Sequence, residues 1–183
     1  MAKKTTLNLK KYTDFIMDKT VNLLNIDSPT GYTDEAAAWV KKEFESLGFE
    51  ACITGKGGVL VNLGGKDKNN ALFLEAHTDT LGGMVSSIKP TGRLVVTPLG
   101  GMNANNAETE NVRVVTKFDG TYEGTFQLTN ASIHVNGEYN DTKRTFESCE
   151  VVLDEDVKTK EDTQKLGISI GDVVCFEPNT RIT

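Results

Sequence analysis

From about residue 85 onward the sequence consists of short apolar runs separated by turn residues, and this pattern constrains the fold more than any other feature. Runs of this length at short, fairly regular intervals are typical of the strands of a small barrel or sandwich. We therefore expect strands at Val85–Ile88, Leu94–Thr97, Val112–Thr116, Tyr122–Leu128, Ser132–Val135, Cys149–Leu153 and Val173–Phe176.

One short helix is expected within this β-rich segment. Thr159 would begin it, and Gly167 would end it. Glu161 and Asp162 would then lie in its first turn, where the helix dipole favours anions.

The N-terminal part has a different pattern. Residues 9–26 carry apolar side chains at roughly the spacing of one helical face, which predicts a first helix. Ser28-Pro29-Thr30-Gly31 ends this helix, because proline disfavours helix before it and glycine permits a tight turn. A second helix is expected from Thr33, as its N-cap, to Gly48, as its C-cap.

The segment after the helices predicts an α/β unit. Phe49–Thr54 and Val59–Leu63 flank a glycine-rich turn, which is typical of a β-hairpin. Ala71-Leu72-Phe73-Leu74 is continuously apolar, which predicts a strand buried on both faces in the middle of an α/β sheet. We place the domain division near residues 83–88, with an α/β domain over residues 1–84 and a β-rich domain over residues 85–183.

The composition argues against several classes of protein. Hydrophobic residues make up 38% of the 183 residues and the net charge is −6, which fits neither a disordered chain nor a nucleic-acid binder with a basic face. No apolar run approaches the roughly 18 to 20 residues that span a bilayer, and none follows the charged Met1-Ala2-Lys3-Lys4. The three cysteines form no C-x-x-C pair. We therefore expect a cytoplasmic protein without nucleic-acid or membrane partners.

His77 is the first candidate for chemistry, because it follows the expected buried strand, where open α/β sheets place their ligands. In an extended segment Asp79 lies on the same side and can hold the imidazole ring, as carboxylates do behind metal-ligating histidines. The alternative is that this His-x-Asp spacing arises by chance. The second histidine, His134, alternates with apolar residues and has no acidic residue at ligand spacing, so we interpret it as structural or exposed.

The stretch Leu74-Glu75-Ala76-His77-Thr78-Asp79-Thr80-Leu81-Gly82-Gly83-Met84-Val85 resembles the first metal motif of the M42 family of metallo-aminopeptidases, the glutamyl or deblocking aminopeptidases. Other stretches are similar in order and spacing: Ser28–Gly31, Thr97–Gly101, Ser132–Val135, Leu166–Ile168 and Gly171–Asp172. Members of this family are often labelled cellulase or endoglucanase, a name that these residues do not support.

The resemblance implies part of a zinc-peptidase-type α/β/α catalytic domain, followed by a β-rich, PDZ-like or barrel-like dimerisation domain. It implies peptide substrates, homo-oligomers and two divalent metal ions, zinc or cobalt, bridged by an aspartate and a water. By that pattern His77 would be a metal ligand, and Asp79 would be the catalytic-site carboxylate behind it.

The resemblance also implies that the bridging aspartate, the glutamate base and the remaining ligands follow the dimerisation domain. We expect the sequence to cover roughly the first half of a family member, so that these 183 residues alone would be inactive. Two alternatives stay open: a non-catalytic assembly module, and a related M20-type or M28-type metal hydrolase.

Overall fold

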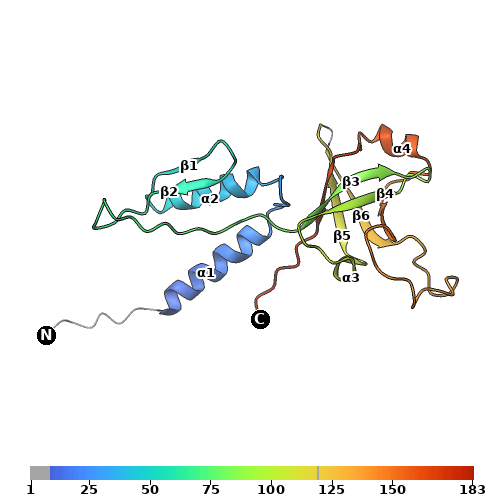
Figure 1. The fold of residues 1–183 in the computed structure, drawn as a ribbon, viewed down its shortest axis with the longest axis horizontal. Helices are drawn as coiled ribbons and strands as arrows, with labels where there is room; N and C mark the ends of the chain where they lie inside the picture. Colours follow the sequence, from blue (N-terminus) through green and yellow to red (C-terminus); the bar gives the residue numbers. More distant parts are fainter. Residues whose placement is uncertain (1–8, 119) are drawn as a thin grey trace. The chain divides into compact units, whose positions relative to one another are not determined.

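The computed structural model describes residues 9–118 and 120–183 (Figure 1). The charged Met1–Lys4 segment lies outside these residues. The chain divides into two compact units: the residues up to Asp27, Asp34–Thr78 and Pro178–Thr183 form the first, and Ser28–Thr33 and Asp79–Glu177 form the second. The short segment between the two helices therefore belongs to the second unit.

The first unit contains the two expected helices, α1 (Leu9–Leu24) and α2 (Asp34–Ser46). Asp34 and Glu35 lie in the first turn of α2, where the helix dipole favours anions. Gly48 follows α2 with a φ of +87°, which glycine adopts without steric cost. A salt bridge of 2.8 Å from Lys19 to Glu43 joins the two helices.

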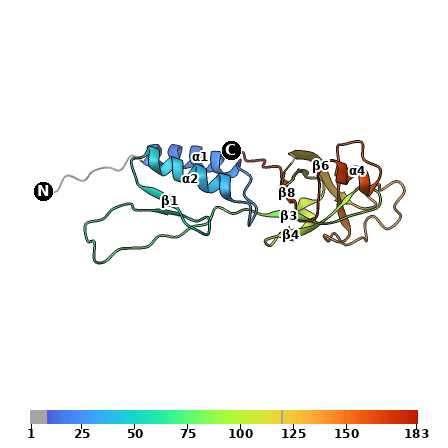
Figure 2. The same cartoon turned by 90° about the horizontal axis from the view of Figure 1, so that it is seen from above.

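The expected hairpin is present beside α2 (Figure 2). It consists of β1 (Ala51–Ile53) and β2 (Val59–Val61), which pair in antiparallel register with Cys52 opposite Leu60. The two strands are shorter than predicted, although beyond their ends the Thr54 N–H still donates to the Gly58 carbonyl and the Asn62 N–H to the Glu50 carbonyl.

The prediction of a buried strand at residues 71–74 was wrong. This segment has no strand partner among the described residues, and Leu72 and Phe73 are 84% and 72% exposed. A strand forms only where a neighbouring backbone accepts and donates its hydrogen bonds, and β1 and β2 pair only with each other. The apolar sequence is therefore present without the sheet that would bury it.

The second unit is built on a closed barrel with the strand order β3-β4-β7-β6-β5-β8 (Figure 1). This confirms the barrel-like alternative for the β-rich part. The strands are β3 (Gly82–Ile88), β4 (Leu94–Leu99), β5 (Asn111–Val115), β6 (Thr121–Leu128), β7 (Cys149–Leu153) and β8 (Val173–Phe176).

Alternating residues of these strands form the barrel core. Phe126 is fully buried, and its ring contacts those of Phe146 and Phe176 at centroid distances of 5.3 and 5.6 Å. Fully or almost fully buried valines and leucines surround it: Val85, Leu94, Val96, Val112, Val114, Leu128, Val151 and Val174. Burial of apolar area on this scale explains why the segment folds as one unit.

Two short helices complete the second unit, α3 (Ala104–Ala107) and α4 (Lys160–Lys165). α4 begins as the sequence predicts, with a capping box in which the Thr159 hydroxyl accepts from the Asp162 N–H and the Asp162 carboxylate accepts from the Thr159 N–H. The pKa of Asp162 is lowered to about 2, chiefly by the hydrogen bond that its carboxylate accepts from the Thr159 hydroxyl.

The prediction of a strand at Ser132–Val135 was also wrong. The segment is a turn in which the Asn136 amide N–H donates to the Ser132 carbonyl at 2.9 Å. The Asn136 side chain closes the turn by donating to the Asn130 carbonyl at 2.8 Å. Ile133 and Val135 alternate in the sequence, but both are exposed, because no strand of the described residues pairs with them.

No helix in the described ranges is long and apolar enough to cross a membrane.

Candidate functional site

Asp79 is held in the second unit by the loop that separates the two N-terminal helices. The Thr30 hydroxyl donates a hydrogen bond of 2.6 Å to Oδ2 of Asp79. Beside it, the Thr80 amide N–H donates to the Ser28 carbonyl at 2.7 Å, and Pro29 and Thr80 form an isolated parallel bridge. We call the residues Ser28–Thr33 together with Asp79–Gly82 the clamp.

The residue types of the clamp follow from its geometry. Gly31 has a φ of +91°, which closes a tight turn in which the Tyr32 N–H donates to the Pro29 carbonyl at 2.7 Å. A Cβ at Gly82 would lie 2.6 Å from side-chain carbons of Pro29, so that close approach requires glycine. The Ser28-Pro29-Thr30-Gly31 stretch therefore both ends α1 and packs against Asp79–Gly82.

Ser28 is almost fully buried, and its hydroxyl has no hydrogen-bond partner among the described residues. An unsatisfied buried hydroxyl ordinarily costs about 1–3 kcal/mol. The clamp therefore buries a polar group at a cost, in the same residue whose carbonyl accepts from the Thr80 N–H.

His77 lies two positions before Asp79, in the first unit. The segment around it is irregular and exposed. Its exposed imidazole is chemically suited to bind a metal ion. His134 is exposed in the turn at residues 132–136, which agrees with the second of the two interpretations from the sequence, a structural or an exposed histidine.

The described residues do not form a complete metal centre. In residues 9–118 and 120–183, no three His, Cys, Asp or Glu side chains come together in a way that could hold a metal ion. A catalytic zinc ordinarily takes three protein ligands.

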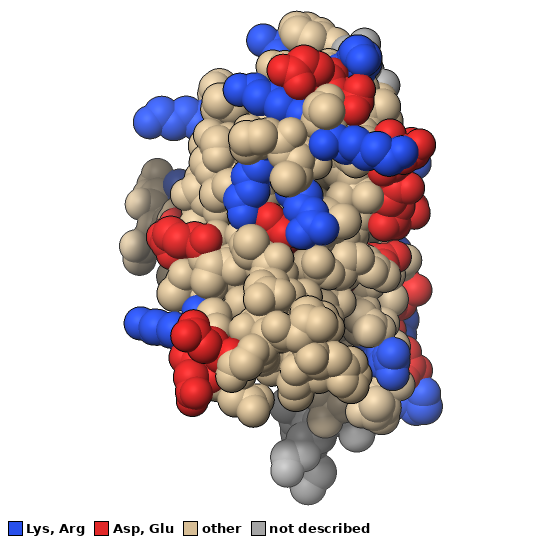
Figure 3. Space-filling view, turned by 90° about the vertical axis from the view of Figure 1, so that its right-hand side faces the viewer, with Lys and Arg blue, Asp and Glu red and all other residues tan. Residues whose placement is uncertain are grey.

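A buried carboxylate that the sequence analysis missed lies on β7. Glu150 is 1% exposed and pairs with Lys89, at 2.7 Å, and with Arg93, both from the β3–β4 turn. On the face shown in Figure 3, basic and acidic side chains are interspersed rather than gathered by sign. The Glu150 cluster therefore stabilises the β3–β4 turn on the barrel.

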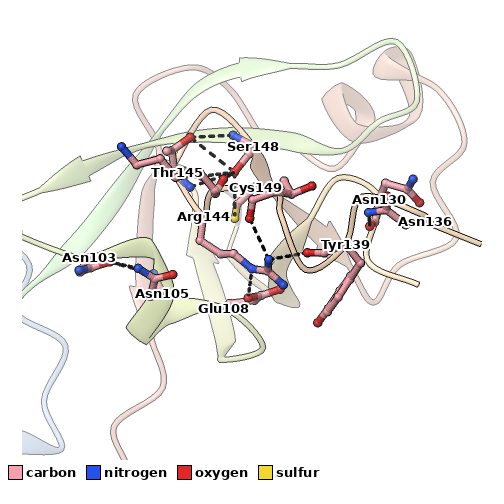
Figure 4. Close-up of polar contacts among 12 residues, drawn as sticks. Asn103, Asn105, Glu108, Asn130, Asn136, Tyr139, Arg144, Thr145, Ser148 and Cys149 are labelled. Carbon is pink, nitrogen blue, oxygen red and sulfur yellow. Dashed lines mark hydrogen bonds and ion pairs between the residues drawn. The ribbon is translucent and has the colours of Figure 1, made fainter. Parts of the chain in front are cut away.

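A second missed cluster fixes the long connection between β6 and β7 (Figure 4). The Arg144 guanidinium donates to Glu108 at 2.8 Å and to the Tyr139 and Thr142 carbonyls at 2.7 and 2.8 Å. It also lies 4.6 Å from the centre of the Tyr139 ring. The Glu108 hydrogen bond raises the pKa of Arg144. With its donors engaged in this way, Arg144 orders the connection rather than a ligand.

A cleft of about 530 Å³ borders the clamp through Tyr32 and is otherwise lined by Val115–Lys117 and Ser169–Val173. The Asp172 carboxylate in its wall is buried and accepts from the Ser169 N–H at 2.7 Å. Asp172 therefore holds the turn that precedes β8.

Comparison with known proteins identifies relatives that cover most of the chain. Residues 57–183 match the family model described as M42 glutamyl aminopeptidase. The chain is 36% identical over 167 residues to YhfE of Bacillus subtilis (strain 168), which is assigned as an aminopeptidase. This match covers 91% of this chain and 48% of YhfE. It is 35% identical over 89 residues to the glutamyl aminopeptidase of Lactococcus lactis subsp. cremoris (strain MG1363), covering 48% of this chain and 25% of that protein.

Solved structures share the fold at low sequence identity. A TET aminopeptidase from a marine sediment thaumarchaeote (Thaumarchaeota archaeon SCGC AB-539-E09) matches with a TM-score of 0.78 and 23% identity, over 94% of this chain and 47% of its own. PhTET1-12s, solved as a dodecamer, matches with a TM-score of 0.72 and 18% identity, over 91% and 47%. The likeness confirms the predicted fold class. The chain spans about half the length of the first curated relative and of these structures.

Proposed function

The chain belongs to the M42 glutamyl aminopeptidase family, and from this premise we propose that the gene product is a metal-dependent aminopeptidase that removes N-terminal residues from peptides. The observation that carries the proposal is the family match over residues 57–183, which includes both His77 and Asp79. Membership in this family disfavours the M20-type and M28-type alternatives.

In this proposal His77 is a ligand of one metal ion, and Asp79 is the carboxylate that fixes the orientation of its ring. A carboxylate in this role selects which ring nitrogen faces the metal and raises the basicity of the imidazole. The exposure of His77 and the hydrogen bond that holds Asp79 support the assignment. Two divalent ions, zinc or cobalt, would lower the pKa of a bound water and polarise the scissile carbonyl.

His77 alone cannot supply the ligands of this centre, and among the described residues no three metal-binding side chains come together. We propose that the other ligands and the general base come from sequence that the relatives have and that these 183 residues do not include. The 183 residues alone would then bind catalytic metal weakly and show no turnover.

We further propose that the second unit mediates homo-oligomer formation. Its barrel has its own buried core, and a solved structure of the same fold is a dodecamer. Light scattering after size exclusion of the full gene product tests this: a strictly monomeric protein at micromolar concentration would contradict it. A cytoplasmic location stays a prediction from the sequence.

The test of the enzymatic proposal uses the full gene product and a chromogenic aminoacyl substrate. We expect hydrolysis that a chelator abolishes and that zinc or cobalt restores. His77→Ala should lower turnover by at least about 100-fold, since a lost ligand removes the metal, whereas His134→Ala should leave it unchanged. Equal activity of His77→Ala and wild type would contradict the proposed role of His77.

A further inference from the structure

We infer that residues 71–74 are a docking strand for the part of the family sequence that these 183 residues do not include. In the full gene product that part supplies the strand partners and the layers that cover Leu72, Phe73 and Leu74. The inference rests on the proposed function in one respect, namely that the gene product extends over the length of its relatives. It assigns a task to the segment directly before His77.

The first support is that this segment has the side chains of an interior strand and lies in solvent. Leu72, Phe73 and Leu74 are 84%, 72% and 72% exposed. Single exposed apolar side chains are ordinary, whereas several in a row form the kind of apolar surface that marks an interaction site. A run without polar alternation is typical of a strand that is covered on both faces. Residues 71–74 therefore lack both faces of cover and both neighbouring strands.

The second support is that the described residues offer no strand to pair with this segment. The barrel of the second unit is closed, so each of its strands already has a partner on both sides. In the first unit β1 and β2 pair only with each other. The backbone N–H and C=O groups of residues 71–74 must therefore take their strand partners from sequence outside the described ranges.

The third support is that the rest of the first unit is also incompletely covered. In α1, which is described along its whole length, no side chain is buried, and Tyr12, Phe15 and Ile16 are about half exposed. Helices of this length take most of their stability from the packing of an apolar face. The missing cover is therefore larger than one added strand, and it requires a substantial length of polypeptide.

The position of the last described residues identifies this polypeptide. Pro178–Thr183 belong to the same unit as residues 71–74. Sequence that continues from there begins in that unit, so its docking is intramolecular and has a high effective concentration. The chain matches 48% of YhfE, so about as much sequence again is available in a relative. A second copy of this chain fits less well, because it brings only another segment 71–74 or the outer edges of β1 and β2.

Hydrogen exchange followed by mass spectrometry tests the inference, with the full gene product and the 183-residue chain compared. We expect the amides of residues 72–74 to exchange at least about 100-fold more slowly in the full gene product, because strand pairing protects amides until it opens. Val112 and Val114 of β5, which is paired on both sides, are the internal reference and should be protected in both proteins.

Two results of this measurement would overturn the inference. The first is exchange of residues 72–74 in the full gene product at the rate of an unstructured peptide. The second is protection in the 183-residue chain that rises with protein concentration, which would show that a second copy covers the segment.

A pair of substitutions tests whether the side chains themselves are covered. Phe73→Asp places a charge where we infer a packed ring, and it should lower the thermal midpoint of the full gene product by at least about 5 °C. Phe118→Asp is the matched control, because Phe118 is 81% exposed in the second unit, and it should shift the midpoint by no more than about 1 °C. Equal shifts would overturn the inference.

Two further measurements support this comparison. In the 183-residue chain Phe73 is already in solvent, so Phe73→Asp should leave the midpoint almost unchanged there. Phe73→Ala replaces the aspartate variant if the full gene product with Phe73→Asp does not fold, and its shift should have the same sign and be smaller.

Failure of the inference and failure of the proposed function give different results. If the full gene product is a chelator-sensitive peptidase that needs His77 while residues 72–74 exchange freely, the inference is wrong and the proposed function stands. If residues 72–74 are protected while His77→Ala is as active as wild type, the proposed role of His77 is wrong and the inference stands.

Discussion

Two apolar segments of similar character behave in opposite ways in this chain. Residues 71–74 lie exposed and unpaired in the first unit, whereas β5, at Asn111–Val115, is paired on both sides and has Val112 and Val114 fully buried. The difference lies in the neighbours, because β5 lies between β6 and β8, and no described strand lies beside residues 71–74. An apolar run gives a tendency to form a strand, and a neighbouring backbone turns that tendency into a strand.

The largest expected contrast between the two units is in thiol reactivity. Cys52 in β1 is exposed, whereas Cys149 and Cys175 in the barrel are buried. Burial raises the pKa of the Cys149 thiol and so lowers its thiolate fraction. We expect a disulfide-exchange reagent to modify Cys52 at least about 100-fold faster than the other two, which need local opening of the barrel. Mass spectrometry of modified peptides measures the rates. Comparable rates at all three sites would show that the barrel core is not closed in solution.

Two phenylalanine substitutions test the same contrast in stability. Phe126→Ala removes a fully buried ring and should destabilise the barrel by about 3–5 kcal/mol. Phe73→Ala removes an exposed ring and should change the free energy of unfolding by no more than about 0.5 kcal/mol. Hydrogen exchange of barrel amides in increasing urea measures the first effect. Fluorescence of Trp39, the single tryptophan, follows the first unit. A large loss in Phe73→Ala would mean that residues 71–74 are packed.

The ion pairs of the two units should differ as well, by a smaller amount. Glu150→Gln removes the charge of a buried carboxylate that binds Lys89 and Arg93, and we expect a loss of about 2 kcal/mol in barrel stability. Glu43→Gln breaks a solvated pair with Lys19 between α1 and α2, and the unfolding midpoint of Trp39 fluorescence should stay unchanged. Added salt should leave the Glu150 effect largely intact. Equal losses of stability in Glu150→Gln and Glu43→Gln would contradict the expected difference between the buried and the solvated ion pair.

The smallest expected effect is the acid sensitivity of α4. The folded-state pKa of Asp162 is about 2, below its ordinary value of 3.8, so its ionised form adds stability above about pH 4, and this contribution disappears as the pH falls toward 2. Asp162→Asn should therefore melt below wild type at pH 6 and approach it at pH 2. Asp156→Asn, on an exposed turn, is the control. A constant difference between wild type and Asp162→Asn over this range would contradict the lowered pKa.

The sequence predicted those parts of the fold that local pattern determines. The six barrel strands were predicted because each alternates or clusters apolar residues between turns, and the beginning of α4 was predicted because Thr159 and Asp162 cap it within four residues. The strand prediction at Ser132–Val135 failed because the Asn136 side chain favours a local turn there over pairing with a distant strand.

The candidate site was predictable only in part. His77 and Asp79 are two positions apart in the sequence, so their spacing could be recognised there. The hydrogen bond from Thr30 to Asp79 joins distant residues and leaves no local pattern. Glu150 was missed for a related reason, because its partners Lys89 and Arg93 come from another hairpin. Contacts of this kind follow from strand order, which the amino-acid pattern does not determine.

The clamp has a consequence for cutting this chain into parts. Because Ser28–Thr33 belongs to the second unit while the residues on both sides of it belong to the first, no single cut of the polypeptide separates the units. A barrel produced from residues 79–177 alone would lack the carbonyl that receives the Thr80 N–H and the proline that packs against Gly82. A synthetic peptide of residues 27–33, added to such a fragment, should bind it and restore its stability. Evolutionary exchange of this barrel between proteins would require the loop to move with it.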